Sequence, residues 1–273
     1  MAEQFNVLQA ALAAGERIYD VLTTKSELED EEGAIEVDHL DGEIEFKNVW
    51  FAYVEEDWIL KDVSFKVNAK ENVAFVGATG SGKTTILSLI VRNYDIQKGQ
   101  ILIDGLDIKK YKIASLRKHI GQMLQDVFLF SGTVESNITL RSDDISSDIV
   151  KEACRFVNAD KVIDKLPNKY NEIVRERGKN FSSGERQLIS FARVVSHKPN
   201  IMILDEATSN IDTETEALIQ DSLKKMMNIG TMLIVAHRLS TIQHCDKIIV
   251  LKKGRIIESG THLELLDKRG HYY

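Results

Sequence analysis

The chain has 273 residues, 43% of them hydrophobic and 28% charged, which is the composition of an ordinary soluble globular protein. Its formal net charge of −7 gives no overall attraction for nucleic acid, so nucleic acid is not expected as a partner. No apolar run reaches the roughly 20 residues that span a bilayer, and the N-terminus lacks the basic start of a signal peptide. Cys154 and Cys245 lie far apart without metal-ligand spacing, which indicates thiols in a reducing, cytosolic setting.

The first expected element is an amphipathic helix over residues 3–23. Its apolar residues recur at helical spacings: Phe5, Leu8, Leu12, Tyr19 and Leu22. Two explanations stay open: the helix packs on its own domain, or it is the cytoplasmic end of a longer helix that the start of the chain interrupts. The acidic residues that follow, Glu27 and 29–32, predict a solvated tether.

Strands are expected from residue 43 onward. Residues 43–51 and 63–67 alternate apolar and polar side chains, as half-buried antiparallel strands do. Four later segments contain continuous apolar runs bounded by polar residues, which suit strands buried on both faces of a parallel sheet: 72–77, 201–206, 231–237 and 247–251. Helical segments separate these runs, so the predicted class is α/β with an antiparallel side sheet. A helix-rich stretch, about 126–193, interrupts the alternation and predicts a helical subdomain.

A phosphate-binding loop is predicted at residues 77–85, GATGSGKTT, directly after an expected strand. Glycines let this backbone curl so that its N–H groups point at phosphates, Lys83 supplies a cation, and the Thr84 hydroxyl is offered to Mg²⁺. The loop residues expected to contact ATP are Gly77, Thr79, Gly80, Ser81, Gly82, Lys83, Thr84 and Thr85. A chance glycine-rich turn is the alternative, but it does not account for the strand before and the helix after.

Two carboxylates end the apolar run 201–206. Asp205 is placed to hold Mg²⁺, directly or through water. Glu206 can polarise a water for attack on the γ-phosphate, as a general base or as a positioning group. A solvated acidic turn is the alternative.

With these motifs, the chain from about Gly42 to Tyr273 resembles the nucleotide-binding domain of an exporter-type ATP-binding cassette (ABC) transporter. "FAYVEEDWILKDVSF" is similar to the segment whose aromatic residue, here Tyr53, stacks on adenine. "MLQDVFLFSGTV" is similar to the Q-loop, whose Gln125 would sense Mg²⁺ and couple to the membrane domains. "AHRLST" resembles the switch region, with His237 near the γ-phosphate. The resemblance implies a P-loop NTPase fold with a RecA-like parallel sheet, an antiparallel β-subdomain and a helical signature subdomain.

"FSSGE", residues 181–185, occupies the place of the family's LSGGQ signature, and an apolar-faced helix is expected from Ser190 onward. The resemblance implies that the signature residues meet the ATP of a second domain in a head-to-tail dimer: Ser182, Ser183, Gly184 and Glu185. "SNID" resembles the D-loop, with Ser209 and Asp212. The signature departs from LSGGQ at Phe181, Ser183 and Glu185. Glu185 either repels the phosphates or complements the helix dipole, and the sequence leaves both open.

Residues 1–40 resemble the junction between the last transmembrane helix and the domain, which would occupy residues 41–273. The chain is therefore expected to be a fragment of a half-transporter, begun at an introduced Met1, whose transmembrane domains are missing and which acts at the cytoplasmic face of the cell membrane. "VRERG" with Glu176 is similar to an exporter feature that touches the cytoplasmic helices of the membrane domain, although a plain solvated charge cluster is the alternative.

The predicted function is an ATP-hydrolysing motor for export, with ATP and Mg²⁺ as ligands. Because the signature is altered while Glu206 and His237 are in place, the predicted partner is an unlike nucleotide-binding domain with a regular signature. The alternatives are a soluble ABC-type ATPase in DNA maintenance or translation and an importer ATPase subunit. A DNA-maintenance ATPase would carry a long coiled-coil insertion and a translation ATPase would carry two cassettes, and this sequence shows neither feature. An importer ATPase would lack the N-terminal helix junction. A P-loop kinase or GTPase has no signature helix. The transported substrate is not indicated.

Overall fold

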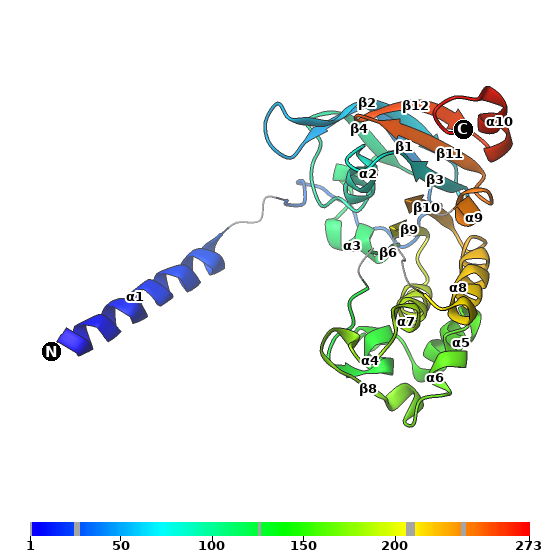
Figure 1. The fold of residues 1–273 in the computed structure, drawn as a ribbon. Helices are drawn as coiled ribbons and strands as arrows, with labels where there is room; N and C mark the ends of the chain where they lie inside the picture. The colour runs from blue at the N-terminus through cyan, green and yellow to red at the C-terminus, as the bar shows by residue number, and fades with distance from the viewer. Residues whose placement is uncertain (1, 25–27, 125–126, 206–210, 236–238) are drawn as a thin grey trace.

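The computed structural model describes residues 2–24, 28–124, 127–205, 211–235 and 239–273. Figure 1 shows α1 (Ala2–Thr23) as a separate rod that stands away from the rest of the molecule. Every residue of α1 whose burial is described is exposed, including Phe5 (59%) and Leu22 (79%). The predicted helix is confirmed, but the explanation that it packs on its own domain is wrong. Within the described residues, no helix is both long and apolar enough to cross a membrane.

A mainly parallel sheet forms the centre of the body, with the strand order β12-β11-β3-β10-β9-β6 within the described residues. Its strands are β3 (Asn72–Val76), β6 (Ile120–Met123), β9 (Ile201–Asp205), β10 (Thr231–Val235), β11 (Lys247–Lys252) and β12 (Arg255–Gly260). All neighbours pair in parallel except β12, which runs antiparallel to β11. The four apolar runs are confirmed as strands of this sheet, whereas β6 and β12 were not predicted.

Alternate side chains of the parallel strands enter two different cores. In β10, Met232 and Ile234 join one apolar cluster, and Leu233 and Val235 join the other. Successive strand residues point to opposite faces of a sheet, so a strand covered on both faces must be apolar at every position. This is why these strands read as continuous apolar runs in the sequence.

One face of the parallel sheet packs against an antiparallel sheet with the order β2-β1-β4-β5. Its strands are β1 (Ile44–Ala52), β2 (Trp58–Val67), β4 (Lys98–Ile103) and β5 (Leu106–Asp107). Phe65 stacks on Phe46 at 4.5 Å between ring centroids and meets Phe75 of β3 edge-on at 5.5 Å. These rings join the two sheets. The same core includes α2 (Lys83–Ile90) and α3 (Ile113–Lys118).

The other face continues into the helical part, which lies below the sheets in Figure 1. This part contains α4 (Val134–Thr139), α5 (Ser147–Phe156), α6 (Asp160–Ile163), α7 (Ser183–Ser196) and the short strands β7 (Gly132–Thr133) and β8 (Ile173–Val174). Leu188 and Phe191 of α7 pack with residues of α4, α5 and α8 (Thr213–Met226). The remaining elements are η1 (Ile108–Lys110), η2 (Lys169–Asn171), η3 (Glu176–Gly178), α9 (Leu239–Ile242) and α10 (His262–Lys268).

The acidic linker after α1 is solvated, as predicted, but its described residues are attached to the body and do not form a loose tether. The N-cap residue of α3, Lys112, makes no side-chain capping hydrogen bond. Asp30 of the linker caps the helix instead, because its Oδ1 accepts from the Ile113 amide at 2.7 Å. Glu31 pairs with Lys110 at 2.8 Å. The linker is exposed, as its charge predicts, but its contacts with α3 and η1 hold it in place.

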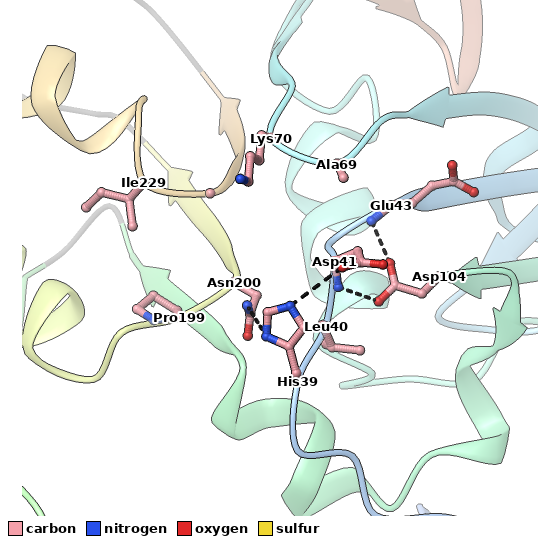
Figure 2. Close-up of a pocket in the computed structure, with 11 residues that line it drawn as sticks. His39, Leu40, Asp41, Glu43, Ala69, Lys70, Asp104, Pro199, Asn200 and Ile229 are labelled. Atoms are coloured by element: carbon pink, nitrogen blue, oxygen red, sulfur yellow. Dashed lines mark hydrogen bonds and ion pairs between the residues drawn. The ribbon is translucent and has the colours of Figure 1, made fainter.

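The start of the body is fixed at the amino ends of the parallel strands (Figure 2). The carboxylate of Asp104 accepts three amide hydrogen bonds of 2.8–2.9 Å, from Asp41, Gly42 and Glu43. Beside them lies a hollow of about 470 Å³, which is lined in part by residues that precede β9 and β10. The predicted phosphate loop follows the carboxyl end of β3. This hollow therefore lies at the other ends of the parallel strands, away from that loop.

Candidate functional site

The loop 77–85 connects β3 to α2, and its three glycines all have positive φ angles: +150° at Gly77, +77° at Gly80 and +104° at Gly82. Two of them, Gly77 and Gly82, are also closely packed. A Cβ atom on Gly77 would lie 2.2 Å from the Leu251 carbonyl oxygen, and one on Gly82 would lie 2.6 Å from Leu60 Cδ2. Both positions therefore need glycine for conformation and for close packing. Since Gly82 is the N-cap of α2 and has no side chain, the first amides of this helix stay available to an anion.

Lys83 places a buried ammonium group inside the curl of this loop. The residue is only 7% exposed, and its Nζ donates to the Gly77 and Ala78 carbonyl oxygens at 2.8 and 3.1 Å. Burial lowers the pKa of Lys83, whereas the negative charge of Asp205 opposes that shift. A polyanion in the loop would strengthen the charged form of this lysine, because opposite charge favours ionisation.

A hydroxyl and a carboxylate meet beside Lys83. Thr84 Oγ1 donates to Asp205 Oδ2 at 3.3 Å, which brings the start of α2 to the carboxyl end of β9. Oxygen ligands of this kind suit Mg²⁺, which is usually held by one or two carboxylates together with substrate phosphates. Among the described residues no group of three or more His, Cys, Asp or Glu side chains could hold a metal by itself. The donors present fit a cation that phosphates help to bind.

Tyr53 follows β1 at the side of the loop and is 51% exposed. Its hydroxyl shares a hydrogen bond of 3.2 Å with Thr85 Oγ1. The ring stands edge-on to Phe51 at 4.9 Å and to Tyr94 at 5.1 Å between centroids. The structure thus brings Tyr53, the loop and Asp205 together, as the sequence predicted. Tyr94 was missed, because a lone tyrosine after a helix gives no local signal of a contact with a distant strand.

A second hollow, of about 440 Å³, adjoins the outer side of the loop. Lys252 and Lys253 at the end of β11 and His271 near the C-terminus contribute to its lining. Lys252 Nζ lies 3.1 Å from His271 Nε2. Sequence reasoning did not single out these basic residues, since none belongs to a recognisable motif.

The signature residues begin a helix earlier than predicted. Helix α7 starts at Ser183 and not near Ser190, with Ser182 as its N-cap. Ser182 Oγ accepts from the Glu185 amide at 3.2 Å, while Glu185 Oε2 accepts from the Ser182 amide at 2.7 Å. This reciprocal pair is a capping box. Of the two roles left open for Glu185, the structure shows the complement to the helix terminus.

Gly184 is packed tightly within the chain. A Cβ atom there would lie 2.3 Å from Thr215 Cγ2 and 3.0 Å from Ile211 Cγ2. Asp212 caps α8 beside this contact, because its Oδ1 accepts from the Thr215 amide at 2.9 Å. That hydrogen bond lowers the pKa of Asp212. The structure therefore brings the signature helix and the described end of the predicted D-loop together.

The other predicted residues are placed less directly. Gln125, Glu206, Ser209 and His237 lie outside the described residues. Glu176 has an exposed side chain and pairs with Lys179 at 3.7 Å, which fits either reading of the charged "RER" segment. Phe181 is 4% exposed and belongs to the apolar core of the helical part. The phenylalanine side chain, which stands where the family signature has leucine, therefore fills apolar space.

Comparisons with known proteins give one consistent result. A family model described as ABC transporter matches residues 60–209. The ABC transporter ATP-binding protein YfiC of Bacillus subtilis, described as uncharacterized, is 47% identical over 272 residues, covering 100% of this chain and 45% of that protein. An ATP-dependent lipid A-core flippase of Syntrophus aciditrophicus is 42% identical over 268 residues, covering 98% of this chain and 44% of the flippase.

A solved structure of a bacterial Atm1-family ABC exporter with ATP bound matches with a TM-score of 0.88 and 37% identity. The match covers 98% of this chain and 47% of that exporter chain. This chain thus spans less than half of the length of the relatives that it matches.

Proposed function

Because the chain belongs to the ABC transporter family, we propose that it is the ATP-binding and ATP-hydrolysing motor of an exporter. The observation that carries this proposal is the convergence of the Lys83 ammonium, the uncapped start of α2 and the Thr84–Asp205 pair at the carboxyl edge of the parallel sheet. A cation, free helix amides and hard oxygen donors are what a magnesium–triphosphate group requires.

We assign the binding roles as follows. Loop residues Gly77 and 79–85 contact the phosphates, and Lys83 neutralises their charge. Thr84, Asp205 and Gln125 hold Mg²⁺, which supplies charge neutralisation at the phosphates when it is bound. Tyr53 presents its exposed ring to adenine, supported by its hydrogen bond to Thr85.

The catalytic roles are proposals that follow from the order of the motifs. Glu206 directly follows Asp205, so its carboxylate is assigned to orient and deprotonate the attacking water. His237 is assigned to the γ-phosphate and Gln125 to signalling toward the membrane domains. Glu206 directly follows β9, whereas Gln125 and His237 each lie two residues after the last residue of β6 and β10.

The proposed partner is a second nucleotide-binding domain of a different half-transporter. In a head-to-tail pair, residues 182–185 would meet the partner's ATP, with Ser209 and Asp212 beside them. The support for an unlike partner is the altered signature beside intact Glu206 and His237, because the Glu185 carboxylate in the first turn of α7 would place a negative charge near the partner's ATP. A partner with a regular signature would complete the ATP site built on Lys83.

The membrane attachment is also a proposal. The exposed apolar residues of α1 support its assignment, with residues 28–40, as the junction to transmembrane domains on the cytoplasmic face of the cell membrane. Relatives of more than twice this length bear names that include ATP-binding/permease protein, which fits that arrangement. Glu176, exposed on the helical part, is assigned to the contact with those domains.

Thermal stabilisation by Mg-ATP tests the binding site. A ligand at 100 times its Kd stabilises the folded state by about 2.7 kcal/mol, and Lys83→Ala should nearly abolish this effect. Lys118→Ala removes an equal charge from the exposed end of α3 and serves as the matched control. Full stabilisation of the Lys83→Ala variant would refute the proposed site.

A further inference from the structure

We propose that Tyr94 is a positioning residue for Tyr53, and that Arg92 anchors the turn that carries it. The inference rests on the proposed stacking of adenine on Tyr53. Tyr94 and Arg92 are the groups that fix the orientation of the Tyr53 ring. The turn, residues 92–95, directly follows the helix that begins at the phosphate loop.

The orientation of Tyr53 depends on contacts outside its own strand. Because the residue lies just past the end of β1 and is half exposed, its strand alone does not hold the ring. Tyr94 meets it at an interplanar angle of 84° and Phe51 at 86°, while Phe51 and Tyr94 also touch each other at 5.7 Å between centroids. Edge-to-face pairs of this kind favour one mutual orientation. Phe51 is buried in the core, so Tyr94 is the exposed member of this support.

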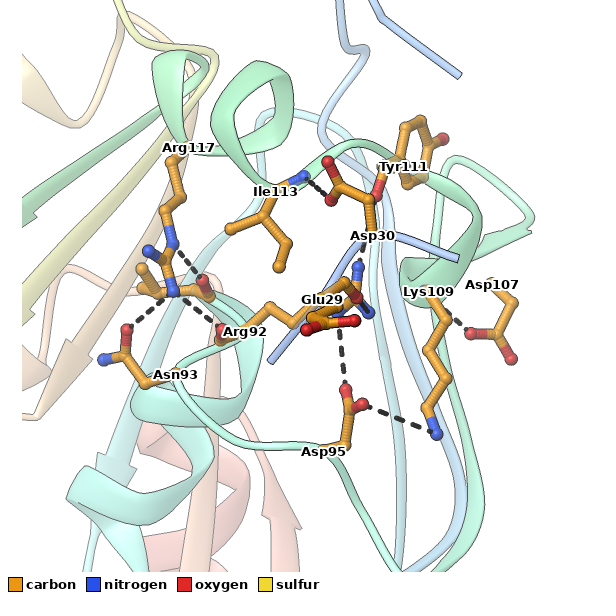
Figure 3. Close-up of polar contacts among 11 residues, drawn as sticks. Glu29, Asp30, Arg92, Asn93, Asp95, Asp107, Lys109, Tyr111, Ile113 and Arg117 are labelled. Atoms are coloured by element: carbon orange, nitrogen blue, oxygen red, sulfur yellow. Dashed lines mark hydrogen bonds and ion pairs between the residues drawn. The ribbon is translucent and has the colours of Figure 1, made fainter. Parts of the chain in front are cut away.

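The turn that carries Tyr94 is anchored by a buried guanidinium group (Figure 3). Arg92 is 1% exposed, and its three donor nitrogens reach three different segments: Nε donates to Asp95 Oδ1 at 3.3 Å, Nη1 to the Tyr111 carbonyl at 3.2 Å and Nη2 to the Glu29 carbonyl at 3.2 Å. Arg117 Nη2 donates to the carbonyl of Arg92 at 2.8 Å. A planar guanidinium group that donates to several partners fixes both the turn and the residues beside it.

Base binding and phosphate binding should therefore depend on different parts of the site. Tyr94 contacts the ring that receives the base, whereas Lys83 and the amides of α2 receive the phosphates. A change at Tyr94 should weaken a ligand that has a base and leave inorganic triphosphate, which has none, unchanged. Arg92 also donates to the Glu29 carbonyl, so the turn that supports the base-binding ring is hydrogen-bonded to the linker that follows α1.

The test is calorimetric titration of the full 273-residue chain with Mg-ATP and, separately, with inorganic triphosphate and Mg²⁺. Tyr94→Ala should weaken ATP binding by about 2- to 10-fold, the range that edge-to-face aromatic contacts represent. Triphosphate affinity should be unchanged, and Tyr94→Phe, which keeps the ring, should restore ATP affinity. Phe156→Ala removes an exposed ring from the end of α5, outside the segments assigned to nucleotide or Mg²⁺, and should change neither affinity.

Arg92→Lys tests whether the guanidinium contacts hold the turn, since lysine keeps the charge but not the planar set of donors. This variant should also weaken the binding of ATP and leave the binding of triphosphate unchanged. Unchanged ATP affinity in Tyr94→Ala, with a loss in Tyr53→Ala, would overturn the positioning role and leave the stacking intact. Equal losses for ATP and triphosphate in Tyr94→Ala would also overturn it, because the residue would then act on the loop as a whole. If Tyr53→Ala binds ATP normally, the stacking fails and the inference fails with it.

Discussion

Glu185→Gln should lower the stability of the isolated domain and strengthen its association with a partner that carries ATP. In the structure, the Glu185 carboxylate accepts the Ser182 amide at 2.7 Å and lies at the start of α7. A neutral amide keeps an acceptor oxygen but loses the charge. The two effects have opposite signs because this carboxylate caps the helix in the isolated chain and, under the proposed head-to-tail pairing, would compete with the partner's phosphate for the helix terminus.

The expected stability loss follows from two contributions. A helix cap contributes about 1 kcal/mol and a charge in the first turn about 0.3–1 kcal/mol. Since glutamine retains part of the cap, the loss should be about 0.5–1 kcal/mol, or a fall in Tm of about 1–4 °C. For association, removing a unit charge about 8 Å from a phosphate at an effective dielectric constant of about 20 is worth at most about 2 kcal/mol, or about 30-fold in affinity.

Differential scanning fluorimetry and ATP-dependent dimerisation, measured by sedimentation with a candidate partner, give the two quantities. Glu264→Gln is the matched control, because Glu264 forms a second capping box with Thr261 on α10, with the Thr261 amide 2.8 Å from Glu264 Oε2. It should lower Tm similarly and leave dimerisation unchanged. An unchanged Tm in Glu185→Gln would refute the capping contribution, and weaker dimerisation would refute the competition with phosphate.

Gly184→Ala should destabilise the domain by about 1–3 kcal/mol in urea unfolding, because the new methyl group must enter occupied space against α8; a loss below about 0.5 kcal/mol would show that α8 moves aside easily. Asp30→Ala removes the carboxylate that caps α3 at Ile113, so amide exchange of residues 28–37 should accelerate while exchange in the central strands stays the same. Burial raises the pKa of the Cys154 thiol to about 12, so its reactive thiolate is scarce at pH 8 and iodoacetamide should label it only on unfolding; rapid labelling of the folded chain would contradict this.

The features predicted well from the sequence are those with local signals. The continuous apolar runs identify β3, β9, β10 and β11, because burial on both faces leaves no polar position. The phosphate loop is equally local, since its glycines and Lys83 are adjacent in sequence. Such patterns need no knowledge of the tertiary contacts.

The features missed depend on contacts between distant residues. The acidic linker reads as a tether because the sequence does not show that Lys110 and the start of α3 lie beside it. Tyr94 gave no sign of its contact with Tyr53 for the same reason. The capping box was different: serine followed three residues later by glutamate is its sequence signature, so the true start of α7 could have been predicted.

ATP hydrolysis with and without an unlike partner domain tests the central claim most directly. The chain alone should bind Mg-ATP but hydrolyse it slowly, and a partner with a regular signature should accelerate turnover. Glu206→Gln should keep ATP binding and reduce the accelerated rate by about 100-fold or more, the size expected for lost general-base help. Brisk, cooperative hydrolysis by the chain alone would contradict the unlike pair, and an unchanged rate in Glu206→Gln within the pair would contradict the catalytic assignment.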